Sequence, residues 1–256
     1  MEGCGSHNVN DYRARVTQNA KLTERIFWMT FEAPELARSV RAGQCLMVFT
    51  PDGAKLLGRP FEAADADPER GEISVCYMLA GEGTEMLSRV KVGEVLKIRG
   101  FVGVPYPEGR GAVAAGGGVG AAGFILARKT GAASELYVGM PGRGCEDFAA
   151  KIKEISPDAK IFTDDGSFGE GDSMFKVLPR DPGGRDVWCC GPMGFLKAMR
   201  RHYADFPQNL YYSLDKRMAC GYGGCMGCVV KTARGLKRVC ADQSLFRADE
   251  VDLNDY

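Results

Sequence analysis

Short apolar and β-branched runs, each closed by glycine or proline, dominate the first hundred residues of the chain. This spacing is typical of antiparallel strands in a barrel or sandwich, because each strand needs a turn before its neighbour. A short helix is expected at 84–89, and a linker rich in proline and glycine at 101–110. The expected strands are 12–18, 26–31, 44–49, 72–79 and 94–99.

From Gly111 onward, short apolar runs alternate with segments of helical character. This alternation predicts an α/β domain with a parallel sheet, because a crossover helix joins one parallel strand to the next. The segment after residue 213 is expected to form a loop-rich module that holds the cysteines. The expected strands are 112–115, 135–139, 160–163, 186–190 and 210–213, and the expected helices are 119–129, 147–155 and 193–203.

The length of 256 residues accommodates two domains and a small appendage. We expect an antiparallel β-barrel domain at 1–106, an α/β domain at 107–210 and a loop module at 211–256. Neither internal repeats nor low-complexity tracts interrupt this organisation.

Charge and composition narrow the classes of function. Lysine plus arginine and aspartate plus glutamate balance at 33 each, which gives no electrostatic argument for nucleic acid or an anionic membrane. The first residues lack the apolar segment of a signal peptide, and the uncharged run 111–127 is too short to span a bilayer. Ten cysteines without a secretion signal favour the reducing cytoplasm. The two histidines, His7 and His202, are expected at the surface rather than in catalysis.

Four cysteines near the carboxyl end form the most specific motif. Cys220, Cys225, Cys228 and Cys240 follow the spacing C-x4-C-x2-C-x11-C, whose first intervals are those of plant-type ferredoxins. The glycines between them let the backbone wrap around sulfur atoms and direct N–H groups at them. The spacing predicts the ligands of one [2Fe–2S] cluster. A zinc knuckle and a disulfide pair are the alternatives, although zinc sites usually repeat C-x2-C and disulfides need an oxidising compartment.

A glycine-rich turn lies between an expected strand and an expected helix. Residues 116–123 contain G-x-G-x-x-G from Gly118 to Gly123, and in this context the backbone can approach a pyrophosphate at a helix N-terminus. The acidic residue that an ordinary Rossmann domain carries about twenty positions later is absent. Such turns also occur for packing alone. The Cys-Gly-Pro segment at 190–192 places a thiol at the carboxyl end of the same sheet, or it is a plain turn with a buried cysteine.

Two segments of the expected barrel are weaker candidates for phosphate binding. Arg59 stands beside the rigid Pro60, where a guanidinium can clamp a phosphate, or where a turn merely exposes a charge. The Gly-Glu-Gly-Thr segment at 81–84 opens the expected helix. Its N–H groups can attract an anion while Thr84 caps the helix, or it is an ordinary capped hairpin.

In this order, the motifs resemble those of the ferredoxin–NADP reductase superfamily, and more closely the electron-transfer subunits of NAD-dependent dihydroorotate dehydrogenase. The resemblance covers nearly the whole chain and is most specific at 163–167 and 217–225. It implies a barrel that holds FAD, an α/β domain that binds NAD(H) and a loop that holds [2Fe–2S]. The implied cofactor-binding residues are Arg59, Pro60, Phe61 and Glu62 along the flavin, Cys76, Tyr77, Met78, Gly83 and Thr84 along the rest of FAD, and Gly117, Gly118, Gly120, Cys190, Gly191 and Pro192 at the nicotinamide nucleotide.

The chain departs from that family at four places. Glu62 stands where the family has serine, Met78 where it often has arginine, Gly123 where a proline is usual, and Ala-Asp-Gln-Ser follows Cys240 instead of x-Asp-Gly-Pro. A serine hydroxyl can donate a hydrogen bond to the flavin, whereas an ionised carboxylate only accepts. We expect Glu62 to rotate away from the flavin, because an uncompensated buried carboxylate costs several kcal/mol. A protonated carboxyl and weak flavin binding are the alternatives.

The resemblance implies a cytoplasmic, NAD(P)H-dependent flavin iron–sulfur oxidoreductase subunit. Electrons are expected to pass between NAD(H), FAD and the cluster, and on to an FMN-containing dihydroorotate dehydrogenase catalytic subunit, in a hetero-oligomer expected as a heterotetramer. That role belongs to pyrimidine biosynthesis. The cofactors carry the chemistry, so no catalytic acid or base is expected. The alternatives are a related reductase subunit with a ferredoxin-linked or sulfur-reducing partner, and a zinc-knuckle module that binds nucleotides.

Overall fold

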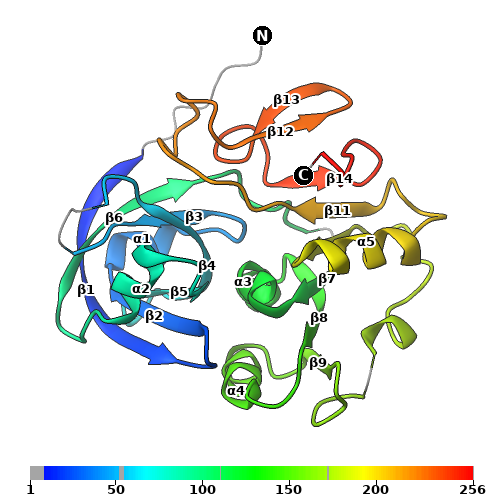
Figure 1. Cartoon of the computed structure of the whole chain (residues 1–256), viewed down its shortest axis with the longest axis horizontal. Coiled ribbons are helices and arrows are strands. Elements are labelled where there is room, and N and C mark those ends of the chain that lie inside the picture. The colour runs from blue at the N-terminus through cyan, green and yellow to red at the C-terminus, as the bar shows by residue number, and fades with distance from the viewer. Residues whose placement is uncertain (1–8, 52–54, 110, 172, 256) are drawn as a thin grey trace.

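Six antiparallel strands close into a barrel in the first part of the chain (Figure 1). The structure is a computed structural model that describes residues 9–51, 55–109, 111–171 and 173–255, so His7 lies outside the described residues. Around the barrel the strands follow the order β1-β2-β5-β4-β3-β6. Their bounds are β1 Asn10–Lys21, β2 Ile26–Glu32, β3 Cys45–Val48, β4 Arg59–Asp67, β5 Glu72–Met78 and β6 Val95–Val102.

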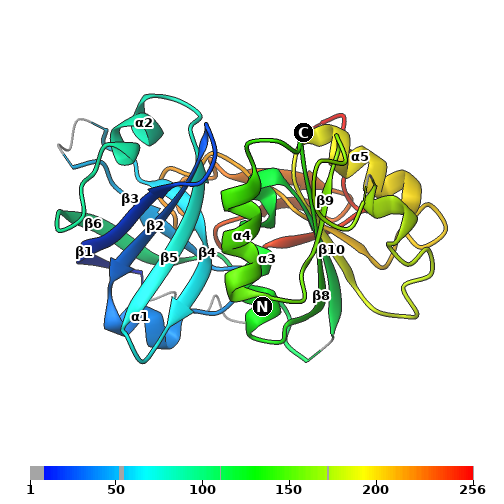
Figure 2. The same cartoon turned by 90° about the horizontal axis from the view of Figure 1, so that it is seen from below.

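Alternation of side chains explains why these segments form a barrel. In β6, Leu96 and Ile98 are buried while Lys97 is exposed, as expected of a strand with one face toward a core. Two short helices, α1 (Pro34–Ser39) and α2 (Glu82–Ser88), lie at opposite ends of the barrel (Figure 2). Each contributes a buried leucine to the core, Leu36 from α1 and Leu87 from α2.

Three predictions for the barrel are wrong in part. No strand was expected at Arg59–Asp67, yet β4 forms there. Pro60 is tolerated because this half of β4 pairs with β3 alone. The helix α1 was not expected, because Pro34 looked like a breaker, but proline is well suited to the first turn of a helix. The predicted linker at 101–110 begins later, since β6 continues to Val102.

The second part of the chain forms a six-stranded sheet in the order β14-β11-β10-β7-β8-β9. The strands β7 to β11 are parallel, which confirms the predicted α/β domain. Figure 2 shows α3 and α4 between this sheet and the barrel, and α5 on the other face. The elements are β7 Ala112–Gly117, the 3₁₀ helix η1 Gly118–Ala121, α3 Ala122–Lys129, β8 Ala133–Met140, α4 Glu146–Ile155, β9 Lys160–Thr163, the 3₁₀ helix η2 Met174–Lys176, β10 Val187–Cys190, α5 Met193–His202 and β11 Leu210–Ser213.

The chain after β11 leaves the sheet and then returns to it. It forms a loop and a hairpin of β12 (Val229–Thr232) and β13 (Gly235–Arg238), and it comes back as β14 (Leu245–Arg247). β14 pairs antiparallel with β11. The predicted final strand at 210–213 is therefore an internal strand, and the loop is anchored to the sheet at both ends.

Apolar packing joins the three parts. Tyr106, in the connection between barrel and sheet, packs on Phe124 of α3 and Trp188 of β10, with ring centroids 5.7 Å and 5.1 Å away. A second buried group of residues joins Met47 of β3 to Cys228 and Cys240 of the loop region. The barrel, the sheet and the loop therefore share their cores.

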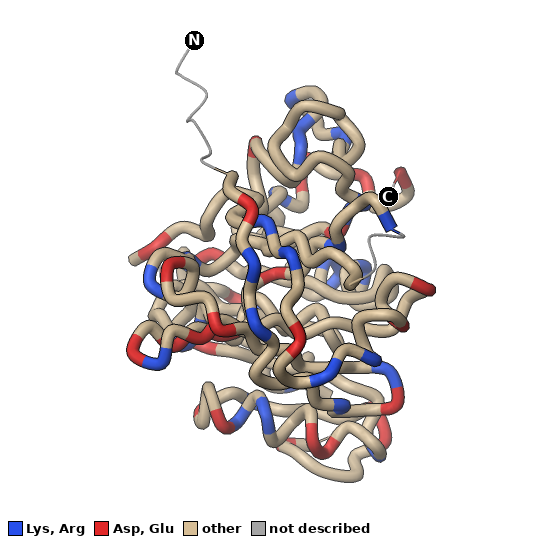
Figure 3. Tube along the Cα trace, turned by 90° about the vertical axis from the view of Figure 1, so that its left-hand side faces the viewer, with Lys and Arg blue, Asp and Glu red and all other residues tan. Residues whose placement is uncertain are grey.

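The surface agrees with the balanced charge of the sequence. Lysine, arginine, aspartate and glutamate alternate over the barrel side of the molecule (Figure 3). Within the described residues, no helix is both long and apolar enough to cross a bilayer. His202, predicted at the surface, is half-buried at the end of α5, where its ring lies 4.8 Å from that of Tyr203.

Candidate functional site

The barrel strands β4 and β5 separate at the segments that the resemblance assigned to the flavin. Backbone pairing between these strands runs from Asp67 and Glu72 to Ala63 and Val75 and stops there. Beyond that point, β4 pairs with β3 and β5 pairs with β2. The backbone of residues 59–62 is therefore not paired with β5 and remains paired with β3. The unpaired edge leaves a place for a bound group.

A pocket of about 420 Å³ adjoins this separation. Its walls come from the start of β4, the first turn of α2 and the segment after β11. A volume of this size is within the range of cofactor pockets. The charged or motif residues that line it are Lys55, Arg59, Pro60, Gly81, Glu82, Gly83, Thr84 and Arg217.

Arg59 lies directly over the first turn of α2. A Cβ added to Gly83 would be 2.3 Å from Arg59 Nε, so a larger residue there would displace the guanidinium from this position. The Thr84 hydroxyl accepts hydrogen bonds from the N–H groups of Ala80 (2.9 Å) and Gly81 (3.2 Å) and donates to Gly81 O (2.8 Å). Thr84 therefore holds the turn, and Arg59 supplies the positive charge.

The segment predicted along FAD on β5 has a different character. Cys76 and Tyr77 are buried in the barrel, and Met78 is exposed. The Tyr77 ring lies 5.2 Å from that of Phe61 on β4, and its hydroxyl donates to Asn19 Oδ1 (3.1 Å). None of Phe61, Cys76, Tyr77 and Met78 lines the pocket, so their contact with a flavin stays a prediction.

Two cations of the pocket were not identified from the sequence. Lys55 is ion-paired with Glu82 of α2 at 2.6 Å, and Arg217 reaches the pocket from the segment after β11. Arg217 supplies a positive charge near the site although Met78 stands where the family often has arginine. The only indication in the sequence was its place in the specific stretch 217–225; nothing singled out Lys55.

The glycine-rich turn and the Cys-Gly-Pro turn are packed against each other at the carboxyl ends of the adjacent parallel strands β7 and β10. A Cβ on Gly117 would be 3.1 Å from Pro192 Cδ, and one on Gly120 would be 2.7 Å from Cys190 O. Gly118, with φ +57°, has open space on the side of its missing Cβ. Because the chain runs to opposite sides from β7 and β10, this is the crevice where open α/β sheets bind ligands.

Cys190 is buried at this crevice, and burial raises the pKa of its thiol well above the ordinary value. A neutral, enclosed thiol is a packing group rather than a nucleophile. The motif residues at 190–192 therefore shape the crevice through their backbone.

Glu62 lies between the two candidate sites. A Cβ added to Gly123 of α3 would be 1.9 Å from Glu62 Cδ, so the carboxyl fills the space that this glycine leaves. Its Oε1 is buried and has no hydrogen-bond partner among the described residues, while the Tyr106 hydroxyl hydrogen-bonds the carboxyl group. Burial raises the pKa of Glu62 to about 7, the Tyr106 hydrogen bond opposes this, and Asp215 adds to it.

The four motif cysteines lie in the loop region between β11 and β14. Backbone N–H groups of Tyr222, Gly224 and Cys225 point at Cys220; burial raises the pKa of this thiol, but these hydrogen bonds outweigh burial and lower it to about 7. The N–H of Gly227 donates to Cys225 Sγ (3.4 Å). Donors aimed at sulfur are what a thiolate ligand needs.

The hairpin β12–β13 brings Cys240 back to Cys228, whose Sγ accepts the Cys240 N–H at 3.4 Å. Arg238 fixes this return: its guanidinium donates to Gly223 O (2.5 Å) and pairs with Asp242 (2.6 Å). Neither Arg238 nor Asp242 was singled out from the sequence.

The thiols stand as two hydrogen-bonded pairs, Cys220 with Cys225 and Cys228 with Cys240. Among the described residues, no three cysteines, histidines or acidic residues are gathered at metal-ligand distance. Burial raises the pKa of Cys240 to about 12, because two packed thiols resist ionisation without a cation. Soft sulfur donors ringed by N–H groups fit an iron–sulfur cluster, and the four-ligand set stays a prediction.

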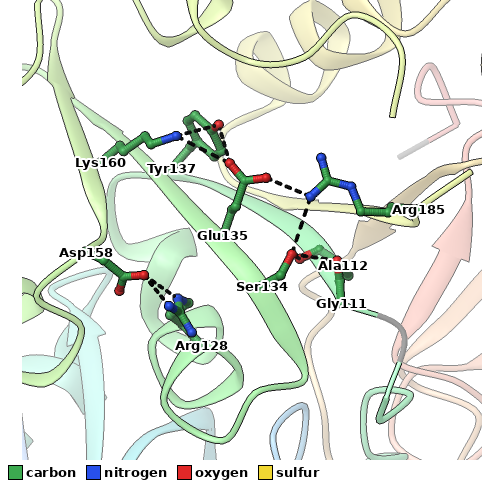
Figure 4. A network of polar contacts seen from close by, with 9 residues as sticks. All are labelled: Gly111, Ala112, Arg128, Ser134, Glu135, Tyr137, Asp158, Lys160 and Arg185. Atoms are coloured by element: carbon green, nitrogen blue, oxygen red, sulfur yellow. Dashed lines mark hydrogen bonds and ion pairs between the residues drawn. The ribbon is translucent and has the colours of Figure 1, made fainter. Parts of the chain in front are cut away.

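A dense polar network elsewhere in the sheet is structural (Figure 4). Glu135 of β8 joins Arg185 Nη1 (2.7 Å), Lys160 Nζ (3.3 Å) and the Tyr137 hydroxyl (2.7 Å). Burial raises the pKa of Glu135, but these hydrogen bonds outweigh it and lower the pKa to about 2. Glu135 and Lys160 lie at the amino ends of β8 and β9, away from the crevice, so the network ties strands together.

Comparison with known proteins gives one consistent result. Residues 215–252, which include the four motif cysteines, match the family model of the iron-sulfur cluster binding domain of dihydroorotate dehydrogenase B. The electron transfer subunit of dihydroorotate dehydrogenase B (NAD(+)) from Caldanaerobacter subterraneus subsp. tengcongensis is 33% identical over 246 residues, which cover 93% of this chain and 97% of that protein.

Solved structures agree with this. A structure of NADH-dependent reduced ferredoxin-NADP oxidoreductase matches with a TM-score of 0.80 and 25% identity over 94% of this chain and 90% of that chain. Phthalate dioxygenase reductase has the same fold, with a TM-score of 0.64 and 14% identity over 94% of this chain and 97% of that chain. The chain is thus a flavin oxidoreductase subunit of the ferredoxin-reductase type, and it belongs to the family of dihydroorotate dehydrogenase B electron transfer subunits.

Proposed function

We propose that the chain binds FAD between β4, α2 and the segment after β11, binds NAD(H) at the crevice between β7 and β10, and holds one [2Fe–2S] cluster through Cys220, Cys225, Cys228 and Cys240. Electrons pass between NAD(H), FAD and the cluster, and between the cluster and an FMN-containing catalytic subunit that oxidises dihydroorotate to orotate in pyrimidine biosynthesis. The complex is a hetero-oligomer, expected as a heterotetramer.

The observation that carries this proposal is the continuity of the pocket with the cysteine loop. Arg217 and Met218 line the pocket, and Cys220 follows two residues later. Gly221 lies against the barrel, with a Cβ position 3.4 Å from Met47 Cγ. One short stretch of chain therefore belongs to the candidate flavin site and to the candidate cluster site. This arrangement supports electron transfer between the two groups inside a single chain.

The residues of the chain bind and orient while the cofactors carry the chemistry. When bound, FAD exchanges a hydride with NAD(H) and single electrons with the cluster. Arg59 and Arg217 offset the negative charge of a diphosphate, and a guanidinium is suited to that because of its planar donors. The tight backbone contact of Gly117 and Gly120 with the 190–192 turn leaves the open face of Gly118 for the nucleotide. The nine cysteines described are free of disulfides.

A direct test uses the purified chain without any partner. We expect it to show flavin and iron–sulfur absorbance, and we expect anaerobic NADH to bleach both. The chain alone should not oxidise dihydroorotate, because the described residues form one barrel and one nucleotide domain and no second flavin domain. Adding the FMN-containing catalytic subunit should start NAD-linked oxidation of dihydroorotate. Oxidation by the isolated chain would contradict the division of labour proposed here.

A second candidate function follows from the structural match to NADH-dependent reduced ferredoxin-NADP oxidoreductase. In this alternative the same cofactor sites serve a ferredoxin-linked partner instead of a dihydroorotate dehydrogenase. Isolation of the native complex from the source cell distinguishes the two, because the catalytic subunit of the first is a dihydroorotate-oxidising flavoprotein and that of the second is not.

Arg217→Ala should weaken FAD binding about tenfold. Arg217 is exposed at the mouth of the pocket, so loss of its contact with a phosphate costs roughly 1.5 kcal/mol, at the lower end for charged hydrogen bonds. Titration of the flavin-depleted protein with FAD, followed by flavin fluorescence, measures the change. Arg38→Ala is the matched control, because Arg38 is an exposed arginine on α1, away from the pocket. Equal FAD affinities in the two variants would show that Arg217 does not contribute to flavin binding.

A further inference from the structure

The Glu62 carboxyl occupies a position that three parts of the chain enclose. Glu62 is on β4, Gly123 beneath it is in the first turn of α3, and Tyr106 beside it belongs to the connection between barrel and sheet. The side chains of a strand alternate, so Glu62 shares a face of β4 with Pro60, which lines the pocket. The carboxyl therefore lies between the candidate flavin pocket and the candidate nucleotide crevice.

The space for this carboxyl depends on the absence of a side chain at position 123. With any other residue there, the Cβ would be 1.9 Å from Glu62 Cδ. The chain differs from the family both at position 62 and at position 123, and these two differences are therefore linked. Gly123 has no side chain, and the Glu62 carboxyl fills the space where one would be. The half-buried side chain therefore lies with its carboxyl against α3 rather than extended into solvent.

The titratable and charged groups around Glu62 come from every neighbouring element. They are Tyr106, Cys45 of β3, which pairs with Glu62 across the strands, Cys190 of β10, and Asp215 after β11. Among them there is no cation. Asp215 is exposed, so solvent weakens its repulsion. Among the described residues, the carboxylate has no ion pair, a negative neighbour, and one hydrogen bond from a hydroxyl that also donates to Ser213. Burial makes its neutral and ionised forms comparable in free energy near pH 7.

A hydrogen-bonded route leads from this carboxyl toward solvent. The Tyr106 hydroxyl donates to Ser213 Oγ (3.1 Å) at the end of β11, and Ser213 is half-buried. Hydroxyl groups both donate and accept, so they can relay a proton without carrying a lasting charge.

We propose that Glu62 is a proton-exchanging residue of the redox unit, which takes up one proton when negative charge accumulates at the adjoining flavin site and releases it when that charge leaves. The inference rests on the proposed function for the presence of FAD. In uptake, one O–H bond forms at the carboxylate and one solvent-derived proton is consumed, while the electrons come from NADH and none resides on Glu62. The nearby negative charge drives the step, because it disfavours a second anion in the same enclosed space.

The first experiment needs no cofactor chemistry. Infrared difference spectra of the purified protein between acidic and alkaline pH should contain a carboxylic acid C=O band that titrates near neutrality and shifts in D₂O. The band should be lost in Glu62→Gln and retained in Glu94→Gln, the same change at an exposed glutamate before β6. In Tyr106→Phe the midpoint should move to higher pH, because a hydrogen bond that favours the carboxylate is removed. This variant keeps the test available should Glu62→Gln fail to fold.

The second experiment measures coupling to reduction. Dithionite reduction at pH 8 should produce the same carboxylic acid band in the reduced-minus-oxidised spectrum, and Glu62→Gln should abolish it. A reduced-minus-oxidised spectrum without this band, or with an unchanged band in Glu62→Gln, would overturn the proposal even if the pH titration succeeds. A purified protein without flavin absorbance would instead overturn the proposed function, and the coupling with it, while the pH titration of Glu62 would stand.

Discussion

Cys228→Ser should remove the iron–sulfur cluster and leave the flavin bound. Cys228 is buried beside Cys240, and its sulfur accepts the Cys240 N–H. No other side chain therefore has room to take its place as a ligand. Serine offers a harder oxygen, which iron–sulfur clusters accept poorly in place of thiolate. Iron and acid-labile sulfide should fall from about two of each per chain, the composition of this cluster type, to nearly none. Electron transfer to a partner should stop.

FAD should stay bound in that variant, because β4 and the first turn of α2 supply most of the pocket, and Arg217 and Met218 are its only walls near the cysteine loop. NADH should still bleach the flavin. Cys145→Ser is the control, since Cys145 is a partly buried cysteine before α4 that belongs to neither pair of motif thiols. Full cluster content in Cys228→Ser would show that the ligand set is wrong, and stoichiometric zinc without sulfide in the parent protein would replace the cluster by a zinc knuckle.

Glu62→Gln should flatten the dependence of stability on pH between pH 4.5 and about 7. The folded carboxyl has a pKa of about 7 against an ordinary value of 4.5, a difference equivalent to roughly 3 kcal/mol. Below pH 4.5 both the folded and the unfolded chain hold the proton, so Glu62 has no effect. As pH rises, the unfolded chain loses the proton first, and stability falls until the folded carboxyl also ionises near pH 7. Above that pH the full penalty is present.

Glutamine does not ionise, so the difference in unfolding free energy between the variant and the parent should rise by about 3 kcal/mol across this window and stay constant above it. Subtraction cancels the contributions of other carboxyls. Thermal unfolding followed by circular dichroism at several pH values measures the difference, with Glu94→Gln as the exposed control. A flat difference curve would mean that Glu62 is solvated in the folded protein.

Periodicity and turn residues located most of the fold. Strands such as Lys160–Thr163 and Leu210–Ser213 were predicted to the residue, because each is a short apolar run between clear breaks. The prediction failed where tertiary pairing overrides local preference. β4 contains Pro60, and it forms because β3 pairs with it on one side. β14 has three residues, too few for a pattern, and it exists because β11 offers an edge.

The sequence predicted those parts of the site that are formed by contiguous residues. It did not predict the parts formed by residues that are distant in the sequence. The cysteine loop and the glycine-rich turn are contiguous motifs, so spacing was enough to find them. Arg217 reaches the barrel from beyond the sheet, and nothing near it in the sequence points to that pocket. For Glu62 we expected rotation away from the flavin; the carboxyl lies against Gly123, a residue 61 positions away that no local pattern connects with it. Its orientation relative to a bound flavin stays a prediction.

The place of β14 in the sheet bears on how the protein is made. Ribosomes release a chain from its amino end, so the barrel and the five parallel strands emerge before Leu245–Arg247 can cover β11. Until then β11 is an edge whose open backbone groups invite pairing with other chains. The part of the chain that contains the four motif cysteines is synthesised late, and it is followed directly by β14, which covers this edge. The four motif cysteines and the strand that protects this edge against aggregation therefore become available at the same stage of synthesis.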